Sequence, residues 1–295
     1  MVKLETSALA LFIDPSHGGA ITSLQSAKFH DEWIFFDKSR RPRHASLENY
    51  DDVWCGGFEE LFPNDAPGVF LDMDLKDHGE LWQREWDIVH RSETGVTLEL
   101  QCETTPATVQ KTVSVNSRQT EIHIDYSLKN TGDKTYPYLF KLHPAMRIEP
   151  GDQILLPDGD VVPVDMKFSK IIADSGPFRW PEIPSNPHSP IDLSIIPARE
   201  KNLQEFVYIK NMTEGWCGVK RKQTGEKFII HYPPKTFPFC WLFMALGGWK
   251  NYYTVVLEPC TNFPKDMHTA LADGTCAIMQ PFETKRFSIT ISLTE

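Results

Sequence analysis

The chain has 295 residues with 30 basic and 40 acidic side chains, and its formal net charge is −10. This charge repels polyanions and leaves no basic stripe for a phosphate backbone, which argues against a nucleic-acid partner. No segment reaches the roughly 20 apolar residues needed to cross a bilayer, and the N-terminus has no apolar core of signal-peptide length. We therefore expect a soluble, cytoplasmic protein that binds neither membranes nor nucleic acid.

In chain order, the main structural signal is the alternation of apolar and polar residues. It is clearest over 96–102, 122–128 and 287–293, and turn-forming residues separate these segments. A period of two predicts strands with one buried face, whereas the apolar stretch 254–257 predicts a strand buried on both faces. Many short strands joined by turns indicate an antiparallel sandwich or barrel. We expect an all-β chain with few short helices, folded as one domain over residues 1–295, because large β units form single domains.

Six cysteines are scattered along the chain without any C-x-x-C pair: Cys55, Cys102, Cys217, Cys240, Cys260 and Cys276. This spacing is typical of neither a zinc ribbon nor a redox motif. A disulfide framework is not expected at this length and spacing. We predict no metal site and no cofactor.

Three regions combine ionisable groups and aromatic rings with glycine or proline. They are 54–65 together with 77–86, then 141–144, and finally 247–261. Planar polar side chains bind sugar hydroxyls, and aromatic rings stack on the apolar face of a pyranose. Glu258 directly follows the buried strand, where a carboxylate needs hydrogen-bond partners or a cleft to face. The three regions therefore predict a carbohydrate pocket and a small-molecule sugar as the partner.

Four short blocks occur in a fixed order: Gly56-Gly57-Phe58-Glu59-Glu60-Leu61-Phe62-Pro63, Asp77-His78-Gly79-Glu80-Leu81-Trp82, Leu142-His143-Pro144 and Leu257-Glu258-Pro259-Cys260-Thr261. Together they resemble the aldose 1-epimerase family of the galactose-mutarotase-like superfamily, over most of the chain. The resemblance implies a large antiparallel β-sandwich with a carbohydrate cleft. It also implies that His143 is a general acid, that Glu258 is a general base, and that His78 binds the sugar.

The chemistry of anomer exchange is consistent with these roles. A base removes the proton of the C1 hydroxyl while an acid protonates the ring oxygen, and the two groups reverse their roles after rotation about the C1–C2 bond. Each group supplies roughly 10² to 10⁴ in rate, and the reaction itself requires neither metal nor nucleotide. For exchange near neutral pH, we expect desolvation to raise the pKa of Glu258 and surrounding carboxylates to keep His143 protonated.

Further contacts to the substrate are expected from Glu59, Trp82, Arg84, Lys141 and Trp249. Arg84 lies six residues beyond His78, and on an extended segment this even separation puts both side chains on one face. Its guanidinium would then bind vicinal hydroxyls or an acidic group of the substrate. An ion pair of Arg84 with Glu80 or Glu85 is the alternative.

Two other functions stay open. A glycoside hydrolase or lyase on the same sandwich would pair Glu258 with Glu59, Glu60 or Glu80, at a carboxyl separation of about 5 to 9.5 Å. A sugar-binding protein without catalysis would use His143 and Glu258 only to bind hydroxyls.

The sequence leaves open which sugar binds and whether it carries a phosphate or another anion, because geometry rather than composition distinguishes the hydroxyls. The cations to inspect for an anion site are Arg84, Lys141 and Arg147. The oligomeric state is also left open.

Overall fold

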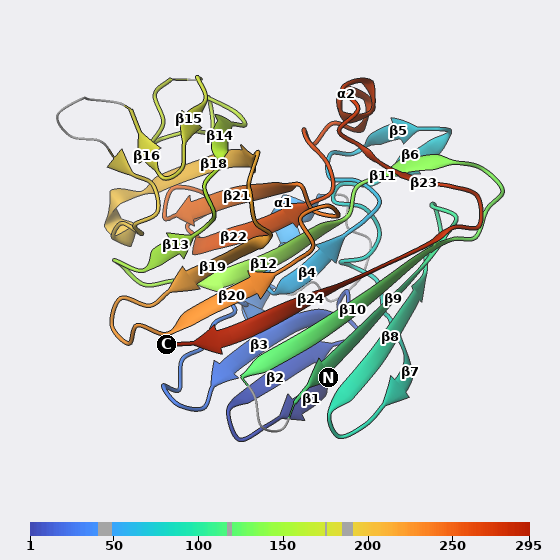
Figure 1. Ribbon diagram of the computed structural model, residues 1–295, viewed down its shortest axis with the longest axis horizontal. Helices are drawn as coiled ribbons and strands as arrows, with labels where there is room; N and C mark the ends of the chain where they lie inside the picture. The colour runs from blue at the N-terminus through green and yellow to red at the C-terminus, as the bar shows by residue number, and fades with distance from the viewer. Residues whose placement is uncertain (41–48, 117–119, 175, 185–190) are drawn as a thin grey trace.

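Two large antiparallel sheets form the body of the molecule (Figure 1). The computed structural model describes residues 1–40, 49–116, 120–174, 176–184 and 191–295. Within these residues one sheet has ten strands, in the order β1 (Val2–Glu5), β2 (Leu9–Asp14), β3 (Ala20–Ser26), β4 (Phe58–Leu61), β12 (Lys141–Arg147), β22 (Tyr253–Cys260), β21 (Phe239–Leu246), β18 (Leu203–Lys210), β14 (Asp160–Pro163) and β15 (Phe178–Arg179).

The second large sheet has eight described strands, in the order β13 (Gln153–Leu155), β19 (Trp216–Lys220), β20 (Lys227–His231), β24 (Thr284–Thr294), β10 (Glu121–Asn130), β9 (Ala107–Val115), β8 (Gly95–Gln101) and β7 (Asp87–Arg91). The three predicted alternating segments are β8, β10 and β24, and β10 pairs with both β9 and β24. The predicted strand at 254–257 lies within β22, which is buried along nearly its whole length.

Smaller elements complete the described chain. Pairs of short strands are β5 (Gly68–Phe70) with β6 (Met73–Leu75), β11 (Tyr136–Tyr138) with β23 (Ala277–Met279), and β16 (Glu182–Ile183) with β17 (Ile191–Asp192). The helices are α1 (Tyr50–Val53) and α2 (Met267–Ala272), with 3-10 turns at Lys38–Arg40 and Arg199–Lys201. The fold is therefore all-β with few short helices, as the alternation predicts. None of the described helices has the length and apolarity to span a membrane.

The apolar core lies between the two large sheets. On β12, Leu142 and Met146 enter this core, and on β22 Val255 and Leu257 do the same. Because successive side chains of a strand point to opposite faces, the alternate residues project from the outer face of the ten-stranded sheet, namely Lys141, His143 and Ala145 on β12 and Val256 and Glu258 on β22. The alternation that builds the core thus also presents His143 and Glu258 on that outer face.

A buried ion pair crosses the core. The Lys111 ammonium on β9 lies 2.7 Å from Glu60 Oε2 on β4, and the Tyr126 hydroxyl on β10 donates to Glu60 Oε1 at 2.6 Å. Both charged side chains are buried almost completely. Since an unpaired charge in such a place is strongly destabilising, this pair ties β4 to the opposite sheet.

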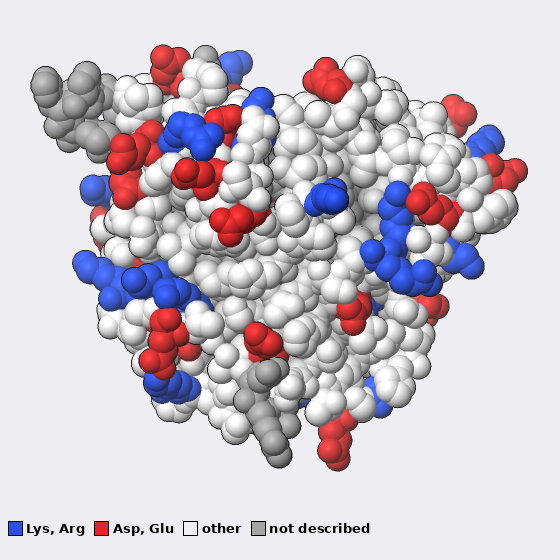
Figure 2. All heavy atoms as spheres, in the orientation of Figure 1, with Lys and Arg blue, Asp and Glu red and all other residues white. Residues whose placement is uncertain are grey.

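All six cysteines lie in described residues, and no disulfide joins them. Lys and Arg lie interspersed with Asp and Glu on the face shown in Figure 2, and no extended basic stripe crosses the described surface in this view.

Candidate functional site

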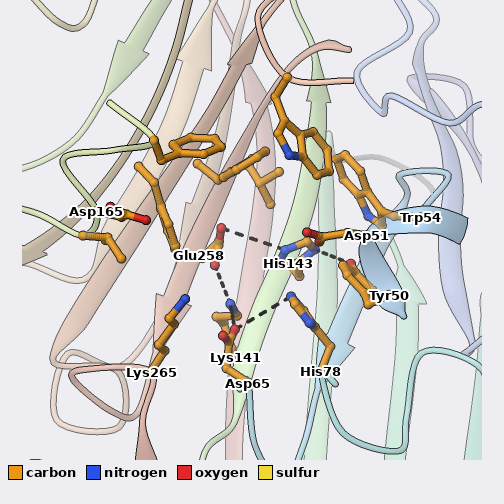
Figure 3. A pocket seen from close by; sticks show the side chains of 16 residues that line it. Tyr50, Asp51, Trp54, Asp65, His78, Lys141, His143, Asp165, Glu258 and Lys265 are labelled. Atoms are coloured by element: carbon orange, nitrogen blue, oxygen red, sulfur yellow. Dashed lines mark hydrogen bonds and ion pairs between the residues drawn. The ribbon is translucent and has the colours of Figure 1, made fainter. Parts of the chain in front are cut away.

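A cavity of about 220 Å³ opens on the outer face of the ten-stranded sheet. Lys141 and His143 on β12 and Glu258 on β22 project into it and point toward one another, and Tyr50 on α1 forms one side (Figure 3). Small-molecule pockets usually span roughly 300 to 1,000 Å³. A cavity at or below the lower end of that range fits one monosaccharide better than a chain of sugars.

The strand register explains how residues distant in sequence meet here. In the β12–β22 pair, Lys141 lies opposite Cys260 and Ala145 lies opposite Val256. Between these two pairs lie His143 and Glu258, one on each strand and on the same face. On the other side of β12, the strand β4 places Glu59 directly opposite His143.

These neighbours form a row with His143 in the centre. Its Nε2 atom lies 3.9 Å from Glu258 Oε1, and its Nδ1 atom lies 3.9 Å from Glu59 Oε2. All three side chains are buried. The imidazole therefore has a carboxyl group beyond each of its ring nitrogens, and Glu258 is the one that lines the cavity.

Lys141 pairs with two carboxylates in the cavity. Its ammonium lies 2.5 Å from Asp65 Oδ2 and 2.6 Å from Glu258 Oε2, and 4.3 Å above the Trp241 ring. Burial lowers the pKa of Lys141, but Asp65 and Glu258 outweigh it and hold the pKa above its usual value. Burial likewise opposes the charge of Asp65, and the Lys141 ammonium keeps the pKa of that carboxyl low.

The pKa values of the predicted acid and base move toward each other. Burial raises the pKa of Glu258 against the opposing effect of Lys141, as expected. Burial, followed by the charges of Lys141 and His78, lowers the pKa of His143 well below its usual value. This direction is opposite to the expectation that carboxylates keep His143 protonated. The two nearby carboxyl groups do not offset these effects, because Glu258 is paired with Lys141 and burial raises the pKa of Glu59 to about 8, so that Glu59 is uncharged at neutral pH.

Glu59 lies behind His143 rather than in the cavity lining. Its Oε2 atom accepts a hydrogen bond from the Tyr50 hydroxyl at 2.7 Å, and the same hydroxyl lies 3.2 Å from His143 Nδ1. Its Oε1 atom lies 4.0 Å from His17 Nε2. Glu59 thus belongs to the layer of side chains that supports His143.

His78 lines the cavity. Its Nδ1 atom lies 2.9 Å from Asp77 Oδ1, its Nε2 atom lies 3.9 Å from Asp65 Oδ2, and its ring stacks on Tyr50 with centroids 3.8 Å apart. The backbone of His78 has a φ of +61°, and its N–H donates to the Asp65 carbonyl at 2.8 Å. This tight turn directs the imidazole into the cavity.

Of the two predicted tryptophans, only Trp249 lines the cavity. Trp249 is half-buried and packs edge-on against Phe243 of β21, with centroids 5.1 Å apart. Trp82 is buried behind Tyr50, where its ring meets the tyrosine edge-on at 4.7 Å and its Nε1–H donates to the Asp77 carbonyl. Trp82 therefore supports the cavity wall without reaching its surface.

The cavity lining does not include Arg84, whose guanidinium lies 2.6 Å from Glu103 Oε1. Residues 77–84 form turns and bends instead of a strand, so the even separation from His78 does not place the two side chains on one face. The ion pair that Arg84 makes is with a third glutamate, not with Glu80 or Glu85. Arg147 likewise lies outside this cavity.

The carboxyl groups considered for a hydrolase partner of Glu258 are also outside the lining. Glu60 is engaged in the core with Lys111. Glu80 accepts hydrogen bonds from the backbone N–H groups of Glu103, Thr104 and Thr105. Glu59 faces the far side of His143, so none of the three flanks the cavity opposite Glu258.

Several cavity residues were not assigned a role from the sequence: Tyr50, Asp51, Trp54, Asp65, Asp165 and Lys265. Trp54 and Asp65 lie within the first of the three regions that predict the carbohydrate pocket, although neither residue has a predicted role of its own. Tyr50 begins a four-residue helix and carries no motif. Asp51, Asp165 and Lys265 are exposed at the mouth of the cavity, and isolated charges of this kind are common on any surface.

No model of a known protein family matches the sequence, and no curated protein matches it. Solved structures do match the fold. The Slr1438 protein of Synechocystis sp. PCC 6803 has a TM-score of 0.74 at 16% identity, over 99% of this chain and 95% of that one. A galactose mutarotase related enzyme from Lactobacillus acidophilus has a TM-score of 0.70 at 12% identity, over 100% of this chain and 97% of that one.

A galactose mutarotase-like protein from Lactobacillus casei ATCC 334 has a TM-score of 0.69 at 15% identity, and each chain is covered over 100% of its length. Identities this low establish the fold alone. The chain therefore has the large antiparallel β-sandwich of the galactose-mutarotase-like proteins, the fold that its sequence blocks resemble.

Proposed function

We propose that the protein is a mutarotase, an aldose 1-epimerase that interconverts the α and β anomers of a free monosaccharide. The observation that carries this proposal is the convergence of His143 and Glu258, whose Nε2 and Oε1 atoms lie 3.9 Å apart in a cavity the size of one sugar. An acid and a base so placed reach the same anomeric centre. The matching solved structures, two of which are named for galactose mutarotase, support the same conclusion.

Ring opening transfers one proton in each direction. Glu258 takes the proton of the C1 hydroxyl, the bond between C1 and the ring oxygen breaks, and His143 gives a proton to that oxygen. The product is the open-chain aldehyde, with the proton moved from the histidine to the glutamate. Rotation about the C1–C2 bond presents the other face of the aldehyde, and the two transfers then run backwards to close the ring.

The converging pKa values favour the proton transfer between the two groups, while the lowered pKa of His143 also reduces the fraction of enzyme that starts with the acid protonated. The cycle uses one exchangeable proton on this pair of side chains. It is on His143 before ring opening and on Glu258 after it. A raised pKa at Glu258 and a lowered pKa at His143 bring the two proton positions closer in energy. The open-chain intermediate then carries less of a penalty for having moved the proton, as expected for an acid and base matched to their task.

We also propose that the substrate is an uncharged aldose. Four carboxyl groups line the cavity, from Asp51, Asp65, Asp165 and Glu258, against the two ammonium groups of Lys141 and Lys265. Lys141 is already engaged by two carboxylates, so it is not available to an anionic group of a substrate. A phosphorylated or acidic sugar therefore meets mostly like charge, although the exposed Lys265 lies at the mouth.

The test is to measure anomer exchange by saturation-transfer NMR on a panel of free aldoses and sugar phosphates. Glu258→Gln keeps the shape of the side chain but removes the base, so kcat should fall by about 10² to 10⁴ while the sugar still binds. Glu93→Gln, at an exposed turn, is the matched control and should leave exchange unchanged.

Each alternative has its own outcome in this experiment. Binding of a sugar without accelerated exchange would identify a non-catalytic sugar-binding protein. Release of reducing sugar from a glycoside would identify a hydrolase. Full activity of Glu258→Gln would show that another group is the base.

A further inference from the structure

Tyr50 contacts both histidines of the cavity with different parts of its side chain. Its hydroxyl lies between Glu59 Oε2, at 2.7 Å, and His143 Nδ1, at 3.2 Å. Its ring lies flat on the ring of His78, with centroids 3.8 Å apart and an angle of 10° between the planes. The side chain is 3% exposed, so these contacts are protected from water.

The helix that carries Tyr50 is held in place by its neighbours. The side chain of Asn49 caps its first turn by accepting from the Asp51 N–H at 3.1 Å. The backbone N–H of Tyr50 donates to Asp77 Oδ2 at 3.2 Å, and the other oxygen of the same carboxylate lies 2.9 Å from His78 Nδ1. Asp77 therefore orients the helix and the imidazole together, which holds the Tyr50 ring against His78.

The hydrogen-bond network assigns the proton of neutral His143. Because the Tyr50 hydroxyl has one hydrogen and donates it to Glu59, its oxygen is left to accept from His143 Nδ1. Nδ1 therefore carries the proton in neutral His143, and the lone pair is on Nε2, which faces Glu258 across the cavity. The hydrogen-bond partner of one ring nitrogen thus decides whether the other nitrogen donates or accepts a proton.

We propose that Tyr50 is a positioning residue with two separable parts: its hydroxyl holds the His143 proton on Nδ1, so that Nε2 exchanges protons with the sugar, and its ring orients His78 for substrate binding. This inference rests on the proposed mutarotase function and names a residue that supports the same site.

Protonation of His143 depends on all the groups that face it. They come from α1, β4, the turn after β6, β12 and β22, and they are Tyr50, Glu59, His78, Lys141 and Glu258. Of these, the Tyr50 oxygen is the group that accepts the Nδ1 proton. Its removal takes the side-chain acceptor away from the N–H of the buried imidazolium, which lowers the pKa of His143 further.

The first experiment compares two substitutions of Tyr50. Tyr50→Phe keeps the ring on His78 but deletes the hydroxyl, so we expect kcat to fall by about 10- to 100-fold with KM changed less than about twofold. The alkaline limb of the kcat profile should move to lower pH. Tyr50→Leu also deletes the stacked ring, so it should lower kcat similarly and raise KM in addition.

Tyr253→Phe is the matched control. It removes a hydroxyl that donates to the Pro197 carbonyl at 2.7 Å and does not line the cavity, and it should change neither kcat nor the pH profile. A Tyr50→Phe enzyme with the kcat and the alkaline limb of the wild type would overturn the role of the hydroxyl. A Tyr50→Leu enzyme with an unchanged KM would overturn the role of the ring.

A second measurement does not depend on activity. Two-dimensional NMR of the ¹⁵N-labelled imidazoles, with His143 assigned from its loss in His143→Asn, reports which nitrogen carries the proton. We expect the Nδ1–H form of neutral His143 in the wild type and a mixture of forms in Tyr50→Phe. An Nε2–H form in the wild type would contradict the assignment, whereas an Nδ1–H form in a protein without exchange activity would contradict only the proposed function.

Discussion

Because Glu59 is buried and uncharged at neutral pH, it should make the free energy of unfolding depend on pH in a way that an exposed glutamate does not. Burial raises its pKa from 4.5 to about 8. Between these two values the folded chain keeps a proton that the unfolded chain releases, so the stability of the folded state falls as the pH rises through this window. Integrated for one group, the loss is about 4 kcal/mol between about pH 5 and about pH 9.

Glu59→Gln removes this dependence because an amide does not ionise. The amide oxygen still accepts the hydrogen bond of the Tyr50 hydroxyl, so wild type and variant should have similar stability at the acidic end. At the alkaline end the variant should be more stable than the wild type by up to about 4 kcal/mol. The other titrating groups are the same in the two proteins, so their effect on the unfolding free energy cancels in the comparison.

The assay is urea unfolding at a series of pH values, followed by tryptophan fluorescence and far-UV circular dichroism. The change in the midpoint at constant m-value gives the difference in unfolding free energy. Glu93→Gln, at an exposed turn, should follow the wild type across the whole range. If the Glu59→Gln curve also runs parallel to the wild type, Glu59 is charged in the folded protein, and the account of the low pKa of His143 fails.

Three further substitutions test the surroundings of the site. Lys141→Met removes the cation next to Glu258, which raises the pKa of that base further, so the acidic limb of the kcat/KM profile should move to higher pH. Trp249→Ala removes an aromatic wall of the cavity and should raise KM by about threefold to tenfold with little change in kcat, measured by the same NMR exchange assay. Lys111→Met leaves the Glu60 carboxylate buried without its cation and should lower the unfolding free energy by about 3 to 5 kcal/mol in urea, and adding Glu60→Gln should restore part of this loss.

Much of the fold follows from local sequence pattern. The period of two over 122–128 and 287–293 is enough to predict β10 and β24 and to say which side chains of each strand are buried. The same rule places His143 and Glu258 on the face opposite Leu142 and Leu257, because neighbours along a strand point to opposite sides. The four sequence blocks add the expectation of a mutarotase-like sandwich, which the structure confirms as a fold.

Other features depended on contacts that no local pattern encodes. The even separation of Arg84 from His78 has structural meaning only on a strand. The backbone between them turns instead, and its N–H groups at His78 and Glu80 donate to carbonyls of a distant segment, residues 62–65. The register of β4 against β12 decided that Glu59 lies behind His143, and a short helix supplied Tyr50 from a segment without a motif.

The charge states of the site also depend partly on the sequence and partly on the tertiary structure. Residue types along the sequence determined that acids, bases and aromatic rings were available for a sugar pocket. Which carboxylate meets Lys141, and which one has its pKa raised by burial to about 8, was decided only when the strands came together. A pKa depends on burial and on the nearest charges in space, and for His143 both of these come from residues remote from it in the chain.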